Sequence, residues 1–217
     1  MTSFDLTQLC IHFGSLLLLA PWLGIYMSRV FSGEKHWLAF LAPVEKNLYA
    51  LSGINPSEEM TWPRYLAALL LFNALGIMMV LALQLTQAHL PLNPQKLPNV
   101  PFWLACNTAV SFVTNTNWQN YAGEKTLSYL TQMLGLTVQN FLSAATGLAV
   151  FLAFGRGLLR HETSTLGNFW TDVTRTTLYI LLPLSVLWAL LLGGQGVVQN
   201  FKPYVQARTL ENAEQII

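Results

Sequence analysis

The chain has 217 residues, of which 53% are hydrophobic and only 10% are charged. Soluble domains carry about 25% charged residues, so this composition excludes an ordinary soluble domain and indicates an integral membrane protein. The formal net charge of +1 gives no indication of a nucleic-acid partner or an anionic substrate.

Four stretches are apolar and long enough to cross a bilayer as helices. They are Leu6–Phe31, Tyr65–Leu85, Leu127–Phe154 and Thr177–Val198. The first follows Asp5 instead of a basic region and lacks a small-residue cleavage pattern. We therefore interpret it as a retained helix and not as a signal peptide.

The basic residues are unevenly shared among the three connections. The first and third connections hold most of them, namely Arg29, Lys35, Lys46, Arg64, Arg156, Arg160 and Arg175. The second connection has only Lys96 and Lys125. The positive-inside rule then predicts that the first and third connections are cytoplasmic, and that both termini and the second connection face outward.

The second connection contains a short apolar segment, Pro101–Phe112. It is too short to span a bilayer, and its length is typical of a re-entrant or interfacial helix. Three prolines between Leu90 and Pro98 exclude an ordinary helix there and predict an outer loop. Pro101 suits the first turn of the short helix, where its missing N–H would be unpaired anyway.

The polar residues Thr114–Asn117 follow this short segment, and the backbone must leave the helix there. Rings of backbone carbonyls can replace the hydration shell of a monovalent cation, so the arrangement suggests a loop of an ion pore. The loop has no carboxylate, which argues against a ring of Asp or Glu for a divalent cation. A polar outer loop that caps a half-buried helix is an equally open interpretation.

Other polar residues near this loop also allow two interpretations. Gln119 can brace the loop or contact an entering ion. In the third span, Thr137, Asn140 and Ser143 are spaced by three and share a helical face. That face can look toward a pore or form hydrogen bonds with other helices.

The motifs of several enzyme classes are missing from the sequence. It has no phosphate loop of the Gly-x-x-x-x-Gly-Lys-Ser/Thr type, no His-Glu-x-x-His zinc helix and no Gly-x-Ser-x-Gly elbow. We therefore predict that the chain has no catalytic group of its own.

The chain resembles the KdpA family, the potassium-binding, channel-like subunit of the bacterial Kdp potassium-transporting P-type ATPase. The resemblance continues to the end of the chain and rests on Leu90–Gln95, Asn107–Gln119, Thr126–Tyr129, Gly135–Ala145 and Ser164–Asn168. In that family, one extra helix precedes four repeats, each with a span, a short pore helix, a filter loop and a second span.

The resemblance implies an all-α membrane protein with four transmembrane helices and one re-entrant pore helix that carries a selectivity-filter loop. It divides the chain into three parts. Residues 1–62 hold the extra helix and a cytoplasmic connection, residues 63–156 form the first pore repeat, and residues 157–217 hold a second cytoplasmic connection, the first span of the second repeat and an outer tail.

The resemblance also implies the site and its ligand. The first filter strand falls on Thr114, Asn115, Thr116 and Asn117, with Val113 and Gln119 adjacent to it. Potassium is the transported ion, and no organic cofactor is expected. The implied partners are KdpB, which hydrolyses ATP, together with KdpC, KdpF and lipid of the bacterial inner membrane.

KdpA proteins are more than twice as long as this chain, which contains one of the four filter loops. A fragment, a disrupted gene product and one piece of a split subunit all remain open. Two other functions are also open: a non-transporting remnant or assembly protein that binds Kdp partners, and a homotetrameric cation channel with one loop per copy.

Overall fold

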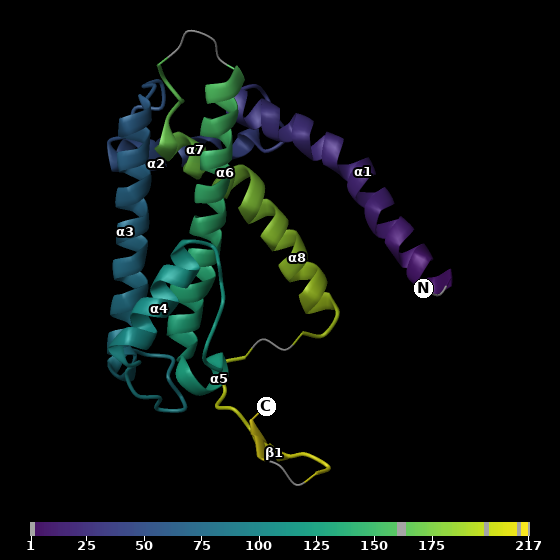
Figure 1. The fold of residues 1–217 in the computed structure, drawn as a ribbon, viewed down its shortest axis with the longest axis vertical. Coiled ribbons are helices and arrows are strands. Elements are labelled where there is room, and N and C mark those ends of the chain that lie inside the picture. The colour runs from purple at the N-terminus through teal and green to yellow at the C-terminus, as the bar shows by residue number, and fades with distance from the viewer. Residues whose placement is uncertain (1–2, 160–163, 198–199, 212–213, 217) are drawn as a thin grey trace.

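The computed structural model describes residues 3–159, 164–197, 200–211 and 214–216. The fold consists of helices and one small pair of strands (Figure 1). The helices are α1 (Ser3–Ser32), η1 (Ala39–Leu41), α2 (Ala42–Ser52), α3 (Trp62–Thr86), η2 (Gln87–His89), α4 (Phe102–Val113), α5 (Gly123–Thr126), η3 (Thr131–Thr137), α6 (Val138–Leu159), α7 (Phe169–Arg175), η4 (Thr176–Leu181) and α8 (Leu182–Gly194). Of these, η3 and η4 are π-helical, and η3 continues directly into α6.

Four continuous helices of the described chain are long and apolar enough to cross a membrane. They are Phe4–Ser32, Trp62–His89, Thr131–Leu159 and Phe169–Gly194. This confirms the predicted class, an all-α membrane protein with four long apolar helices. A shorter apolar helix, α4, lies between the second and the third of them in the sequence.

The long helices alternate in direction (Figure 1). α1 and α6 run toward the end of the molecule that holds α2, whereas α3 and α8 run away from it. The connection between α1 and α3 and the C-terminal end of α6 therefore lie at the α2 end, whereas α5 and β1 lie at the opposite end. Arg160 of the third connection lies outside the described residues. Which of the two ends faces the cytoplasm stays a prediction.

α4 packs against the lower half of α3; the chain enters α4 from the α5 end of the molecule, and the segment that follows α4 returns to that end (Figure 1). Its alanines Ala105 and Ala109 are both completely buried. Small residues let helices approach closely, and here they allow α4 to pack against α3. A buried cluster joins these elements: Val80, Val100, Ala105, Ala109, Phe112, Leu127 and Leu136.

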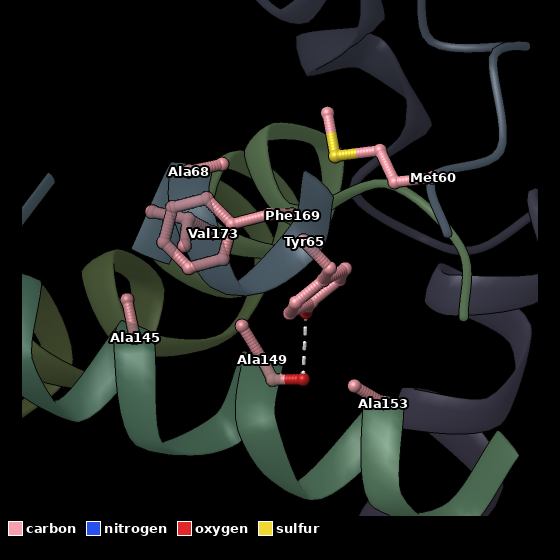
Figure 2. Packing of buried hydrophobic residues seen from close by; sticks show 8 residues of the cluster. All are labelled: Met60, Tyr65, Ala68, Ala145, Ala149, Ala153, Phe169 and Val173. Carbon is pink, nitrogen blue, oxygen red and sulfur yellow. Dashed lines mark hydrogen bonds between the residues drawn. The ribbon is translucent and has the colours of Figure 1, made fainter. Parts of the chain in front are cut away.

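A second cluster lies toward the other end, between α3, α6 and α7 (Figure 2). Three alanines of α6, spaced by four residues, form one wall of it: Ala145, Ala149 and Ala153. Tyr65 and Phe169 lie opposite, and the Tyr65 hydroxyl donates to the Ala149 carbonyl at 2.8 Å. The buried hydroxyl thus has an acceptor inside an otherwise apolar contact.

The fourth long helix begins at Phe169, eight residues before the predicted Thr177. Asn168 caps it, because its side-chain oxygen accepts from the backbone N–H groups of Trp170 and Thr171. Asp172 and Arg175 interrupt the apolar run, so the sequence did not predict this first part as membrane-spanning. Both side chains form ion pairs inside the protein. The helix ends at Gly194, and the predicted end, Val198, lies outside the described residues.

The third long helix also differs from the prediction at both ends, because it runs from Thr131 to Leu159 instead of Leu127 to Phe154. Leu127 precedes the helix and belongs to the buried cluster around α4. The tail, for which no strand was predicted, has β1 (Gln206–Arg208) antiparallel to β2 (Glu214–Ile216).

Candidate functional site

The loop that leads into α4 is held by two glutamines at the end of the second long helix. Gln84 and Gln87 are both fully buried. The Gln84 amide donates to the Ala105 carbonyl of α4 at 3.1 Å, and the Gln87 amide donates to the carbonyls of Pro98 and Thr126 at 2.6 and 2.8 Å. These bonds tie the entry and exit of the α4 segment to one helix end.

The candidate filter segment, Thr114–Asn117, turns back onto the C-terminus of α4. The N–H of Thr114 donates to the Val110 carbonyl at 3.0 Å, and the N–H of Asn115 donates to the Phe112 carbonyl at 3.3 Å. The N–H groups of Thr116 and Asn117 both donate to the Ser111 carbonyl, at 3.0 and 3.2 Å. The segment thereby satisfies carbonyls that the end of a helix leaves unpaired.

This pattern sets the direction of the carbonyl groups. In a trans peptide unit the N–H of one residue and the C=O of the preceding residue point in opposite directions, and no described peptide bond is cis. Because four successive N–H groups point into the end of α4, the carbonyls of Val113, Thr114, Asn115 and Thr116 point away from it. Within the described residues, these four carbonyls and that of Asn117 accept no hydrogen bond.

Left-handed backbone at two asparagines makes this path possible. Asn115 and Asn117 both have φ of 57°. Asparagine adopts this conformation more readily than most non-glycine residues, which accounts for a filter-like turn without glycine. All four residues of the segment are exposed, so the outward-pointing carbonyls lie at an open surface of the chain.

Side-chain hydrogen bonds link the segment internally and to α6. The hydroxyls of Thr114 and Thr116 lie 2.8 Å apart. The Asn115 side-chain oxygen accepts from the Asn117 amide and from the Ser143 hydroxyl of α6, each at 3.3 Å. Ser143 is therefore the member of the predicted polar face of the third span that reaches the segment.

The other polar residues of the third span have different surroundings. Thr137 and Asn140 are exposed, whereas Gln139 is buried on a different face. A Cβ atom at Gly76 of α3 would lie 2.9 Å from the Gln139 side-chain oxygen. A side chain at position 76 would therefore displace the amide of Gln139.

Gln119 lies beyond the segment and is exposed. Its amide donates to the Tyr121 hydroxyl at 3.0 Å. The neighbouring carbonyl, that of Trp118, accepts from the Ser111 hydroxyl at 2.9 Å. Of the two uses considered for Gln119, the bond to Tyr121 corresponds to bracing of the loop.

The segment from Val113 to Tyr121 contains no acidic or basic side chain, so backbone and side-chain dipoles set its electrostatics. Neutral carbonyls suit a monovalent cation better than a divalent one, which usually needs carboxylates. In the described part of the chain, no group of three or more His, Cys, Asp or Glu residues could hold a metal ion.

The buried charges lie at the opposite end of the bundle. Arg156 forms a two-pronged ion pair with Asp172, at 2.6 and 2.8 Å, and Tyr65 donates to the same carboxylate at 3.0 Å. Glu45 of α2 pairs with Arg175 at 2.8 Å. These pairs link the helices to one another and to α2.

Glu45 also accepts hydrogen bonds from Tyr49 at 2.8 Å and Tyr179 at 2.6 Å. Burial by itself raises the pKa of the Glu45 carboxyl. The hydrogen bonds from Arg175, Tyr179 and Tyr49 and the charge of Arg175 outweigh burial, so the net pKa is lowered. Glu45 is therefore an ionised anchor for α2.

Sequence reasoning missed several residues that shape this site. Ser111, Gln84 and Gln87 were not singled out, although each is a polar side chain within or at the end of an apolar helix. Such residues usually have a hydrogen-bonding role, and this signal was available in the sequence. Their partners depend on how the loop folds and were not available there.

Comparisons with known proteins point to one family. The family model for KdpA, the potassium-transporting ATPase A subunit, matches residues 10–217. Three similar curated proteins are all named potassium-transporting ATPase potassium-binding subunit. They come from Bordetella pertussis (57% identical over 97% of this chain), Pseudomonas entomophila (55% over 100%) and Methylococcus capsulatus (56% over 97%).

The chain covers 36% of the Bordetella and Methylococcus proteins and 39% of the Pseudomonas protein. The shared region is the N-terminal part of these relatives. It includes every residue of the candidate filter segment, since the family match runs from residue 10 to residue 217. The chain belongs to the KdpA family of potassium-transporting ATPase subunits.

Proposed function

We propose that the chain forms part of the potassium-binding and translocating subunit of an ATP-driven potassium uptake complex, and that it supplies one of four filter loops. The observation that carries this proposal is the row of carbonyls that point away from α4, those of Val113, Thr114, Asn115 and Thr116. Such carbonyls can replace water around a potassium ion when a ring of them closes. The names of the relatives support potassium as the ion.

The remaining parts of the proposal follow the family. The chain is a non-catalytic component: KdpB hydrolyses ATP, and KdpC and KdpF complete the complex. Residues 1–62 hold the extra helix and the connection with α2, residues 63–156 form the first pore repeat, and residues 157–217 open the second repeat. α4 is the re-entrant pore helix of the first repeat.

A chimera tests the function directly. Residues 1–217 replace the corresponding N-terminal part of the Pseudomonas entomophila subunit, and the chimera is produced with the other subunits of that complex. Purified complex should hydrolyse ATP faster on addition of potassium, with sodium much less effective. Complex that assembles but shows no stimulation by potassium would contradict the proposal and favour a non-transporting role.

The 217-residue chain by itself should not carry a selective potassium flux, because one loop is about a quarter of a four-loop ring. Flux into liposomes that hold the purified chain tests this expectation. Robust flux of potassium over sodium would contradict the shared-ring arrangement and favour the homotetrameric channel.

The proposed location is the bacterial inner membrane, with the N-terminus and the filter loop outside and the α2 end in the cytoplasm. Single cysteines at Ser57 and Asn120, with Cys10 and Cys106 replaced, test the orientation. Both positions are exposed. A membrane-impermeant thiol reagent added to intact cells should label Asn120→Cys and leave Ser57→Cys unlabelled, and the reverse pattern would contradict the orientation.

A further inference from the structure

Ser111 occupies the last turn of α4 and is completely buried. It contacts the candidate filter segment through two different atoms. Its carbonyl oxygen accepts from the N–H groups of Thr116 and Asn117, at 3.0 and 3.2 Å. Its hydroxyl donates to the carbonyl of Trp118 at 2.9 Å. Ser111 thus binds two backbone N–H groups of the segment and also the carbonyl of Trp118, the residue that follows the segment.

The hydroxyl bond reverses the direction of the backbone. The carbonyls of Val113 to Thr116 point away from the end of α4, because their peptide N–H groups point into it. The carbonyl of Trp118 points back toward α4, because it accepts from Ser111. The reversal follows Asn117, which has a left-handed φ of 57°.

We propose that Ser111 is a positioning residue that ends the row of ion-facing carbonyls before Trp118 and thereby sets the discrimination between potassium and smaller monovalent cations. The inference rests on the proposed function of the segment. Without the hydroxyl, the Trp118 carbonyl loses its buried donor and is free to rotate. The row of carbonyls then has no fixed end and adapts more easily to a smaller ion.

A matched control lies one turn earlier on the same helix. Thr108 is also buried, at 2% exposure, and its hydroxyl donates to the Leu104 carbonyl of α4 itself at 2.9 Å. Thr108→Val removes this hydroxyl with little change in volume and touches no bond to the filter segment. Ser111→Ala and Thr108→Val therefore both remove one buried hydroxyl, and only the first removes a bond to the loop.

The test uses the chimeric subunit in the assembled ATPase complex, with ATPase activity titrated against potassium and against sodium. The measured quantity is the apparent affinity for potassium divided by the apparent affinity for sodium. We expect Ser111→Ala to lower this ratio by about threefold to tenfold, the equivalent of one hydrogen bond, with a maximum rate close to that of the parent. Thr108→Val should leave the ratio unchanged.

Ser111→Cys provides a second variant with a similar volume and a weak S–H donor. Its ratio should lie between those of the parent and Ser111→Ala, and it carries the test if the alanine variant does not assemble. If assembled Ser111→Ala and Ser111→Cys complexes keep the parent's ratio of potassium to sodium affinity, the positioning role is overturned. The same holds if only their maximum rate falls. A parent chimera without potassium stimulation would instead overturn the proposed function, and the role of Ser111 with it.

Discussion

The Ser143 hydroxyl of α6 donates to the side-chain oxygen of Asn115 at 3.3 Å, across 28 positions of sequence. This bond joins the candidate filter segment to the helix that follows it. Asn115 has a left-handed backbone, so hydrogen bonds to its side chain stabilise the turn. The same oxygen accepts from Asn117, which extends the connection along the segment.

Ser143→Ala should therefore weaken the apparent potassium affinity of the chimeric complex about threefold to tenfold, as expected for one lost hydrogen bond. Thr146→Val is the control, because the Thr146 hydroxyl donates to Leu142 of its own helix at 2.8 Å. Potassium titrations of ATPase activity measure both variants. Equal affinities in the two would show that α6 does not hold the segment.

Gln119→Arg should weaken the apparent potassium affinity far more than Gln95→Arg. Gln119 lies two residues beyond the segment, whereas Gln95 lies in the proline-rich outer loop. Two unit charges about 6 Å apart repel by roughly 2–3 kcal/mol at an effective dielectric constant of 20, and salt screens them beyond about 8 Å. This corresponds to a loss of about thirtyfold to a hundredfold.

The same potassium titration measures this pair of variants. Small and equal shifts for Gln119→Arg and Gln95→Arg would mean that Gln119 is remote from the ion path. Gln119→Asn serves as a neutral variant that also disturbs the bond to Tyr121. It separates the effect of charge from that of lost bracing.

Asp172→Ala should destabilise the chain by about 3–5 kcal/mol, because it leaves Arg156 without its buried partner. The Asp172 side chain is 3% exposed and that of Arg156 is 19% exposed. In the double variant Arg156→Met and Asp172→Leu, no unpaired charge remains, and most of the lost stability should return. Unfolding in detergent provides the measurement, and a double variant as unstable as Asp172→Ala would contradict the explanation.

The contribution of Glu45 to stability should depend on pH. Its pKa is lowered from the ordinary value of 4.5, so the unfolded chain takes up a proton before the folded chain does. The stabilisation is fully present above pH 4.5 and is lost as the pH falls through the lower pKa of the folded state.

The free energy of unfolding of the parent and of Glu45→Gln, measured from pH 7 down to pH 3, tests this expectation. The difference between the two proteins should be constant down to about pH 5 and should shrink at lower pH. A difference that grows as the pH falls would contradict the assigned direction of the pKa shift.

Hydropathy and length were sufficient to predict the four long helices and the short one, because burial in lipid requires long apolar runs. The start of the fourth helix was missed because Asp172 and Arg175 interrupt the apolar run. Their partners, Arg156 and Glu45, lie 16 and 130 residues away in the sequence. Local pattern alone does not report such pairs.

The position of the candidate filter segment was predicted from the polar residues after a short apolar helix. The direction of its carbonyls was not predictable, because it depends on where the amides of Thr116 and Asn117 find acceptors. Ser111 supplies these acceptors and looks like an ordinary small residue of an apolar helix. The sequence left two interpretations open, a pore loop and a polar loop that caps α4. Both fit one geometry, because the N–H groups that cap α4 belong to the peptide units whose carbonyls point away from it.

The most direct measurement of the central claim is the position of a bound monovalent cation in the assembled complex. Thallium, a heavy substitute for potassium, can be located by anomalous scattering in crystals of the chimeric complex. We expect a peak within coordination distance of the carbonyls of Thr114–Asn117. In a complex that is stimulated by potassium, thallium bound elsewhere and absent from this segment would contradict the claim.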